Sequence, residues 1–230
     1  MSAATTPHEV SFDAGGRAGE VAGLLARPAG ARCLLVLAHG AGAGMRHPFM
    51  ESAAAELGRR GMATLRYQFP YMQRASRRPD PPAVLQAAVR AAVRAAAAAA
   101  PGLPLLAGGK SMGGRMTSLA AAAEELEGVR GIVLFGFPLH AAGSPSAERG
   151  AHLSRVTVPM LFLQGTRDRL ADLDRLRPLL APIPGATLSI LQGADHSFHP
   201  PKSSGRGGAE VLAEIAETVT TWAAETLRLA

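Results

Sequence analysis

Short apolar runs alternate with longer stretches of helical spacing along this chain. Apolar residues that recur every three or four positions predict amphipathic helices, whereas a short apolar run between Gly, Pro or Asp predicts a strand covered on both faces. The predicted strands are 33–38, 63–67, 103–107, 131–135, 160–164 and 188–191, and the predicted helices are 48–60, 82–100, 112–126, 172–180 and 209–229. Such alternation is typical of an α/β domain with a mainly parallel sheet and helices on both faces.

The N-terminal segment has a different pattern. Residues 8–12 and 20–27 flank the turn signal Asp13-Ala14-Gly15-Gly16 and predict an antiparallel hairpin at a sheet edge. No internal repeat and no Pro/Ser-rich or charge-dense linker divides the chain, so we expect one domain over residues 1–230. The irregular stretch 138–158 is too short for a separate lid domain.

The composition excludes several classes of protein. At 230 residues, 47% hydrophobic and 18% charged, the chain can bury a core and is too apolar for intrinsic disorder. Its single cysteine, Cys33, excludes an internal disulfide framework and favours a reducing compartment. Neither a secretory signal at the N-terminus nor an apolar run of ~18 residues is present, so we expect a cytoplasmic protein that does not cross a membrane.

The strongest chemical signal is a Gly-x-Ser-x-Gly motif at residues 109–113. The motif follows an apolar strand and opens a helix, which is the strand–turn–helix setting of a nucleophile elbow. The glycines avoid collisions in a tight turn, and Ser111 stands at a helix N-terminus, where developing negative charge is favoured. We therefore predict that Ser111 is a nucleophile; the alternative is an ordinary serine in a glycine-rich turn.

Candidate partners of Ser111 follow the last two predicted strands. Asp168 comes after the strand 160–164, and His196 comes after the strand 188–191. The carboxyl ends of parallel strands meet at one edge of a sheet, and the order Ser, Asp, His suits a catalytic triad on such a fold. His196 is therefore the predicted base and Asp168 the residue that orients it. A turn-capping role is the alternative for Asp168.

A glycine-rich loop after the strand 33–38 is the candidate oxyanion hole. It reads His39-Gly-Ala-Gly-Ala-Gly44, and its small residues let backbone amides approach a substrate closely. The amide of Ala41, or of Gly42, is predicted to act together with that of Met112, and each such donor is typically worth ~3 kcal/mol of the barrier. A plain strand-to-helix turn is the alternative.

Several sequence blocks together resemble one family. The blocks are His39-Gly-Ala-Gly-Ala-Gly-Met45, His47-Pro-Phe-Met50, Arg66-Tyr-Gln-Phe-Pro-Tyr71, Gly108-Gly-Lys-Ser-Met-Gly-Gly-Arg115, Gly136-Phe-Pro-Leu-His140, Gln164-Gly-Thr-Arg-Asp168 and Asp195-His-Ser-Phe198. They resemble the α/β-hydrolase-like family that includes testis-expressed protein 30 and subunit 3 of the NSL chromatin complex. The resemblance covers residues 33–199. It implies an α/β-hydrolase fold akin to dienelactone hydrolases, with Ser111, Asp168 and His196 at the triad positions.

Nucleotide and metal sites are not supported by the sequence. Residues 109–111 resemble the end of a phosphate-binding loop, but Pro104 stands where that motif requires glycine. The glycines of the 39–44 loop resemble a dinucleotide fingerprint, but Met45 or His47 occupies its last position. A His-x-x-His pattern beside one carboxylate is a weak metal signal. We therefore expect no metal and no organic cofactor.

Residues near the predicted strand ends are candidates for the substrate pocket. Tyr67 and Phe69 lie at the end of one strand, Phe137 lies just after another, and Gly42 belongs to the glycine-rich loop. Because α/β domains bind ligands at this edge of the sheet, we predict that these four residues line the pocket. Ordinary packing in the core is the alternative, since aromatic rings bury a large area wherever they lie.

The positive charge of the chain is concentrated in one segment. The chain has 24 Lys and Arg against 18 Asp and Glu, a formal net charge of +6. Between Arg59 and Arg94 there are eight arginines and one acid, Asp80, so this segment alone carries +7. Such a zone is consistent with an anionic small substrate or an acidic partner, and also with an ordinary solvated face. Nucleic-acid binding is the weaker interpretation.

These observations together predict a serine hydrolase. Its substrate would be a small carboxylic ester or a related acyl compound, processed through an acyl-enzyme. The order of Ser111, Asp168 and His196 favours this interpretation. The alternative is a non-catalytic binding module that keeps the same fold in order to contact protein or nucleic acid.

Overall fold

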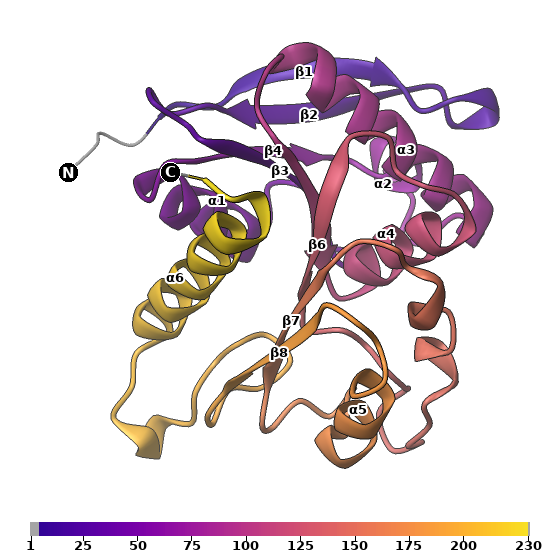
Figure 1. The fold of residues 1–230 in the computed structure, drawn as a ribbon. Helices are drawn as coiled ribbons and strands as arrows, with labels where there is room; N and C mark the ends of the chain where they lie inside the picture. The colour runs from indigo at the N-terminus through magenta and orange to yellow at the C-terminus, as the bar shows by residue number, and fades with distance from the viewer. Residues whose placement is uncertain (1–4, 230) are drawn as a thin grey trace.

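The structure, a computed structural model, describes residues 5–229. Residues 1–4 and 230 belong to the domain that the sequence predicts over 1–230, and they lie outside the described residues. Within the described part, eight strands form one sheet (Figure 1). The strands are β1 (His8–Asp13), β2 (Glu20–Ala26), β3 (Cys33–Ala38), β4 (Met62–Tyr67), β5 (Leu105–Lys110), β6 (Val129–Phe135), β7 (Met160–Gly165) and β8 (Ala186–Leu191).

The sheet is mainly parallel and has an antiparallel hairpin at one edge, as the sequence predicts. The strand order is β1-β2-β4-β3-β5-β6-β7-β8. The β1–β2 and β2–β4 pairs are antiparallel, and the other neighbouring pairs are parallel. All six residues of β3, of β4 and of β7 are buried. Because these strands are covered on both faces, their sequences are nearly continuous apolar runs.

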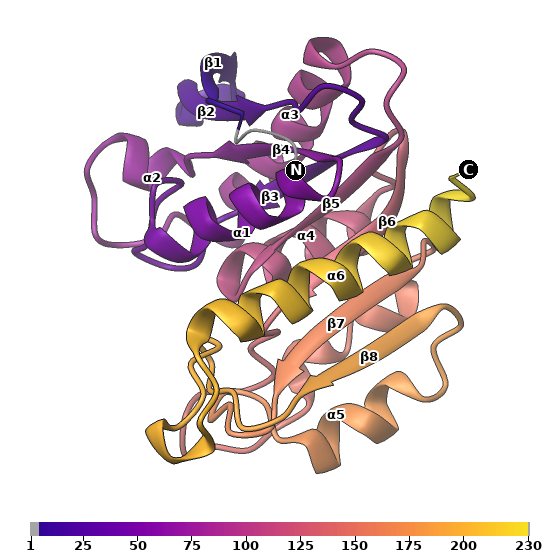
Figure 2. The ribbon, with the colours of Figure 1, turned by 90° about the vertical axis from the view of Figure 1, so that its left-hand side faces the viewer.

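The helices are α1 (Pro48–Arg59), α2 (Pro70–Gln73), α3 (Pro82–Ala99), α4 (Met112–Ala123), α5 (Leu173–Leu180) and α6 (Gly208–Leu227). α1 and α6 pack together on one face of the sheet, and α3 and α4 pack on the other (Figure 2). Successive residues of β3 alternate between the layers: Leu35 and Leu37 face α1 and α6, whereas Leu34 and Val36 face α3 and α4. Within residues 5–229, no helix is both long and apolar enough to cross a membrane.

The boundaries of β5 and α4 differ most from the sequence prediction, and the short helix α2 was not predicted. β5 covers Leu105–Lys110 rather than 103–107, because two glycines that read as strand breakers lie inside the strand. A Cβ at Gly108 would be 2.1 Å from the carbonyl oxygen of Val133, so glycine is needed where β5 approaches β6. α4 ends at Ala123 rather than 126, and α2, with four residues, is too short to show helical periodicity in the sequence.

The parallel strands end at one edge of the sheet, and the loops at this edge carry the predicted site residues. β3 leads through a glycine-rich loop to α1, whereas β5 passes directly into α4 at Ser111. The loop after β7 carries Asp168, and the loop after β8 carries His196. The strand order therefore brings together residues that are far apart in the sequence.

Candidate active site

Ser111 lies between the last residue of β5 and the first residue of α4 in a strained backbone conformation, with φ 51° and ψ −117°. A Cβ at Gly109 would be 2.6 Å from the carbonyl oxygen of Ala38, and a Cβ at Gly113 would be 2.5 Å from the same oxygen. Any larger residue at either position would collide with β3. The Gly-x-Ser-x-Gly spacing is therefore a packing requirement of the turn that exposes the Ser111 hydroxyl.

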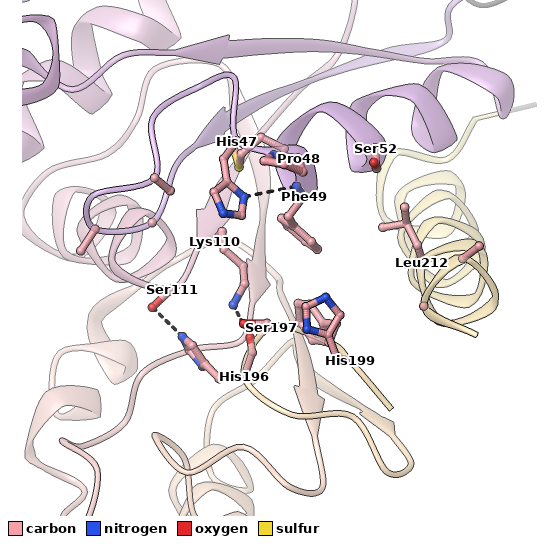
Figure 3. A pocket seen from close by; sticks show the side chains of 17 residues that line it. His47, Pro48, Phe49, Ser52, Lys110, Ser111, His196, Ser197, His199 and Leu212 are labelled. Atoms are coloured by element: carbon pink, nitrogen blue, oxygen red, sulfur yellow. Dashed lines mark hydrogen bonds between the residues drawn. The ribbon is translucent and has the colours of Figure 1, made fainter. Parts of the chain in front are cut away.

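Ser111, His196 and Asp168 form one hydrogen-bonded chain. The Nε2 atom of His196 lies 2.8 Å from the Ser111 hydroxyl oxygen (Figure 3), and its Nδ1 atom lies 2.7 Å from Oδ2 of Asp168. The Asp168 side chain is 1% exposed, whereas that of His196 is 25% exposed. A carboxylate accepts a hydrogen bond from Nδ1, which leaves the Nε2 lone pair directed at the serine. This is the arrangement in which an imidazole can take up the serine proton.

Gln164 holds Asp168 in place, a role that the sequence analysis missed. Its side-chain amide donates to Oδ2 of Asp168 at 2.5 Å and accepts from the backbone N–H of Phe137 at 3.0 Å. The backbone N–H of Leu170 donates to the other carboxylate oxygen at 2.8 Å. Gln164 is fully buried. In the sequence it could have been noticed only as the single polar residue near the end of the apolar run of β7.

Asp195 organises the loop that carries His196. One oxygen of its carboxylate accepts from the backbone N–H groups of Ser197 and His199, at 2.8 and 2.9 Å. The next residue in this turn, Phe198, adopts a positive φ of 65° and is buried. A short side chain that accepts local backbone hydrogen bonds can stabilise a tight turn of this kind. His196 is thus fixed by its neighbours before any substrate binds.

Lys110 is a further residue of the site that the sequence analysis left out. Its ammonium group donates to the carbonyl oxygen of His196 at 2.5 Å (Figure 3) and lies 4.9 Å from the centre of the Phe198 ring and 5.8 Å from that of Phe49. Burial lowers the pKa of Lys110 to about 8, while the carboxylates of Asp168 and Asp195 act in the opposite direction.

The 39–47 loop borders Ser111. A Cβ at Gly40 would be 3.8 Å from the Cβ of Ser111, so the loop lies in contact distance of the nucleophile. Within residues 5–229, no protein group accepts a hydrogen bond from the backbone N–H of Ala41 or of Met112. The N–H of Gly42, in contrast, donates to the Tyr71 hydroxyl at 2.9 Å. Ala41 is therefore the better of the two loop amides proposed for an oxyanion hole, which stays a prediction.

His39 supports this loop from the core. Its ring is fully buried and lies edge-on to Phe69, with the ring centres 4.9 Å apart. Nε2 accepts from the backbone N–H of Phe69 at 3.1 Å, so Nδ1 carries the proton and donates to the carbonyl oxygen of Gly40 at 2.7 Å. Burial lowers the pKa of His39 to about 4, and the ring is neutral at pH 7. His39 is therefore a structural residue.

The 66–71 segment, which begins with the last two residues of β4, also holds the backbone of the 39–47 loop. Arg66 donates to the carbonyl oxygen of Met45 at 3.0 Å, and the side-chain oxygen of Gln68 accepts from the N–H of Met45 at 2.9 Å. Together with the Tyr71 hydroxyl on Gly42, these bonds hold the loop at two places. The segment acts through the loop and not as a wall of the pocket.

A cavity of about 790 Å³ opens beside Ser111 (Figure 3). It lies between the 39–47 loop, α1, the start of α6 and the loop after β8, and its wall is mostly apolar. The lining residues are Gly40, Ala41, Ala43, His47, Pro48, Phe49, Met50, Ser52, Lys110, Ser111, His196, Ser197, Phe198, His199, Gly208, Ala209 and Leu212. Ser111 and His196 thus face a space large enough for a small organic substrate.

Comparison with known protein families matches residues 31–224 to the family described as "Alpha/beta hydrolase domain". The chain belongs to this alpha/beta hydrolase family. The match includes Ser111, Asp168 and His196 as well as the 39–47 loop. It agrees with the parallel sheet, the edge hairpin and the elbow at Ser111.

Solved structures of other α/β hydrolases align with this hydrolase-family chain over almost its whole length. A dienelactone hydrolase from Anabaena variabilis is 22% identical and has a TM-score of 0.76, covering 96% of this chain and 97% of that one. A serine hydrolase without a lid from Xanthomonas campestris is 22% identical, with a TM-score of 0.74 over the same shares. A serine hydrolase homologue from Coxiella burnetii is 19% identical, with a TM-score of 0.74 over 100% of both chains. At these identities the likeness shows the fold alone.

The structure does not place the four predicted pocket residues in the cavity wall of this hydrolase-family protein. Tyr67, Phe69 and Phe137 are at most 1% exposed. Tyr67 and Phe69 pack in the layer of α3 and α4, and Phe137 packs edge-on against Phe162. Gly42 lies in the right loop, but its neighbours line the cavity and it does not. These rings pack in the core because β4 and β6 are inner strands of the sheet. Helices therefore cover the aromatic residues at and just after the ends of these strands.

The arginine-rich segment between Arg59 and Arg94 also lies outside the cavity wall. Five of its eight arginines form ion pairs: Arg59 and Arg60 with Glu56, Arg66 with Glu51, Arg74 with Asp80, and Arg90 with Glu124. Three of these four acids come from outside the segment. The fold thus supplies counter-charges that the count along the sequence does not reveal.

Proposed function

We propose that this protein is a serine hydrolase that cleaves a small carboxylic ester or a related acyl compound. The observation that carries the proposal is the hydrogen-bonded chain from Asp168 through His196 to Ser111, which ends in an open cavity. Membership of the alpha/beta hydrolase family supports it. No step of the proposed reaction needs a metal or an organic cofactor.

Acylation begins when the Ser111 oxygen attacks the acyl carbon of the substrate. His196 takes up the hydroxyl proton at Nε2, and Asp168 stabilises the resulting imidazolium through Nδ1. The carbonyl oxygen becomes an oxyanion, which the backbone N–H groups of Ala41 and Met112 stabilise, with help from the N-terminus of α4. The bond to the leaving group then breaks, and His196 gives its proton to the departing alcohol.

Deacylation repeats these steps with water. His196 accepts a proton from a water molecule as its oxygen attacks the acyl-enzyme. The second tetrahedral intermediate collapses, the bond to the Ser111 oxygen breaks, and the serine regains its proton from His196. The products are the carboxylic acid and the free enzyme.

Labelling with a fluorophosphonate probe tests the proposal. We expect covalent labelling of the wild-type protein and its loss in Ser111→Ala, because the probe reacts with an activated serine. Ser52→Ala is the matched control, since Ser52 lines the same cavity from α1 but, within residues 5–229, makes no hydrogen bond to a histidine. A panel of 4-nitrophenyl esters of increasing acyl length then defines the substrate. Absence of both Ser111-dependent labelling and ester turnover would refute the proposal.

The narrower resemblance, to the family of testis-expressed protein 30 and NSL subunit 3, belongs to the proposal as well, as does a cytoplasmic location. A small acyl substrate follows from the size of the cavity. That the substrate carries a negative charge stays a prediction, made from the positive charge of the arginine-rich segment. The non-catalytic binding module is the alternative. It would be supported if the protein neither reacted with the probe nor hydrolysed esters, but bound a partner in a pull-down. Neutralising Arg74, Arg77 and Arg78 should then abolish that binding.

A further inference from the structure

Lys110 stands out among the basic residues of the chain. The chain has 24 lysines and arginines, and only Lys110 and Lys202 are lysines. Lys110 directly precedes Ser111 at the end of β5, and its side chain lies in the cavity wall (Figure 3). A compact ammonium group therefore lies beside the nucleophile and its base, in a chain that otherwise uses the larger guanidinium.

The position of the Lys110 ammonium is closely defined. It donates to the carbonyl oxygen of His196 at 2.5 Å, and it lies near the faces of the Phe49 and Phe198 rings, whose centres are 5.6 Å apart. Aromatic faces attract a cation, most strongly where water is excluded. A Cβ at Gly136 would be 3.0 Å from the ammonium nitrogen and 3.5 Å from Nδ1 of His196. The amine and the imidazole are thus neighbours beside Gly136, whose positive φ of 67° favours glycine.

The charges around Lys110 and His196 come from three places. Asp168 bonds to His196 from the loop after β7, Asp195 lies in the loop after β8, and Lys110 itself ends β5. His47 and His199 line the same cavity, and no Asp or Glu of the described residues does. Burial lowers the pKa of Lys110 to about 8, so the amine is mainly protonated at pH 7. A positive ammonium and a negative carboxylate therefore both lie beside the imidazole of His196.

We propose that Lys110 is a positioning residue for His196: its ammonium anchors the His196 loop, and its positive charge favours the neutral imidazole, which is the form that accepts the Ser111 proton. The inference rests on the proposed hydrolase function. A positive charge nearby disfavours a second positive charge on the imidazole, and this opposes the effect of the Asp168 carboxylate. Asp168 can then orient the ring without holding a proton on it.

NMR titration of the His196 ring tests this charge effect without any need for activity. Lys110→Met removes the charge and keeps the length of the side chain; we expect it to move the His196 titration midpoint to higher pH by about 0.5–1 unit. Lys110→Gln, a second neutral variant, should also raise the midpoint. Lys110→Arg keeps the positive charge and should leave the midpoint at the wild-type value. Lys202→Met is the matched control on the other lysine, which is exposed. An unchanged midpoint in both neutral variants would overturn the inference.

The pH profile of kcat/KM separates the charge effect from simple anchoring. If the charge of Lys110 matters, the acid limb of the Lys110→Met profile moves to higher pH, so the loss of activity is ~3–10-fold greater at pH 5.5 than at pH 8. A purely structural anchor would lower kcat/KM by one factor at every pH, and parallel profiles would refute the proposal. Absence of Ser111 labelling in the wild-type protein would refute the hydrolase function instead, while the NMR titration would still decide the role of Lys110.

Discussion

The two sides of the candidate site are held by different kinds of interaction. The 39–47 loop, on the side of the oxyanion hole, is fixed by side chains that hydrogen-bond its backbone: the buried His39, Arg66 and Tyr71 and the half-buried Gln68. None of these bonds involves a carboxylate. The loops that carry Asp168 and His196 are instead held by charged groups, namely the two carboxylates of Asp168 and Asp195 and the ammonium of Lys110.

This difference matches the task of each side. An oxyanion hole needs backbone N–H groups in a fixed place, and groups that keep one charge state between about pH 5 and 9 provide this, namely the neutral His39, Gln68 and Tyr71 and the permanently charged Arg66. An acid–base pair must gain and lose a proton, so the charges around it decide at which pH it works. Changes behind the 39–47 loop should therefore lower the rate equally at all pH values, whereas changes around His196 should alter the pH profile.

The largest effect is expected from Asp168→Asn, on the charged side. The amide would favour the wrong tautomer of His196, and we expect kcat to fall by roughly 10⁴-fold with little change in folding. Steady-state kinetics with a 4-nitrophenyl ester would measure the loss. Asp174→Asn, on the first turn of α5, is the matched control and should stay near the wild-type rate. A loss smaller than ten-fold would show that Asp168 does not orient the base.

The next effect concerns the stability that two buried histidines contribute, His39 in the 39–47 loop and His152 beside α4. Burial lowers the pKa of both His39 and His152 to about 4 in the folded protein, from 6.5. Each lowered pKa means that the unfolded chain binds the extra proton, so stability is full above pH 6.5 and is lost as pH falls towards 4, by about 3 kcal/mol for the fully buried His39 and by less for His152. Urea unfolding between pH 4 and 7 measures this slope, which we expect to correspond to nearly two protons.

His39→Phe and His152→Phe form a matched pair for this slope. Each variant should remove about one proton from the pH dependence of unfolding. Of the two, only His39 belongs to the 39–47 loop and bonds its backbone, so only His39→Phe should also lower kcat, by about 10-fold or more and by the same factor at each pH. An equal loss of kcat in both variants would mean that general destabilisation, and not the loop, causes it.

A smaller effect is expected from Tyr71→Phe. The change removes the hydrogen bond to the Gly42 N–H, and we expect kcat to fall about 3–10-fold at constant KM, because the loop serves the transition state. The control is Tyr67→Phe, since the buried Tyr67 hydroxyl has no hydrogen-bond partner within residues 5–229. That variant should keep its activity. A rise in KM alone for Tyr71→Phe would assign the loop to ground-state binding.

The smallest effect is expected outside both sides of the site. Arg77 and Arg78 belong to the arginine-rich segment and do not line the cavity. Replacing both by glutamine should change kcat/KM by less than about two-fold, for a neutral ester and for one that carries a carboxylate, since exposed charges are screened. A selective rise in KM for the anionic ester would instead link this segment to the substrate.

The catalytic candidates could be read from the sequence because each lies just after an apolar strand. Ser111 has the added signal of glycines at 109 and 113, which the turn requires for lack of space. Gln164 and Lys110 could not be read in this way. Gln164 lies inside an apolar run, and Lys110 acquires its neighbours only when Phe49 of α1 and Phe198 of the loop after β8 come together.

The aromatic residues show most clearly where sequence reasoning ends. Tyr67, Phe69 and Phe137 lie near strand ends, as Phe198 does, and periodicity cannot tell which of them faces solvent or substrate. The helices decide this, because they cover the first three, while the cavity between α1 and α6 leaves Phe49 and Phe198 at its wall. The apolar character of a side chain predicts that it is buried, but not whether it packs in the core or lines the cavity.

By itself the sequence determined the alternation of strands and helices, the elbow at Ser111 and the order of the site residues, because these depend on local spacing and on the common edge of a parallel sheet. Only the tertiary structure decided which loop amide is engaged by Tyr71, where the cavity opens and which charges face His196. These features depend on contacts between residues tens of positions apart, and their distances are set by the packing of whole elements.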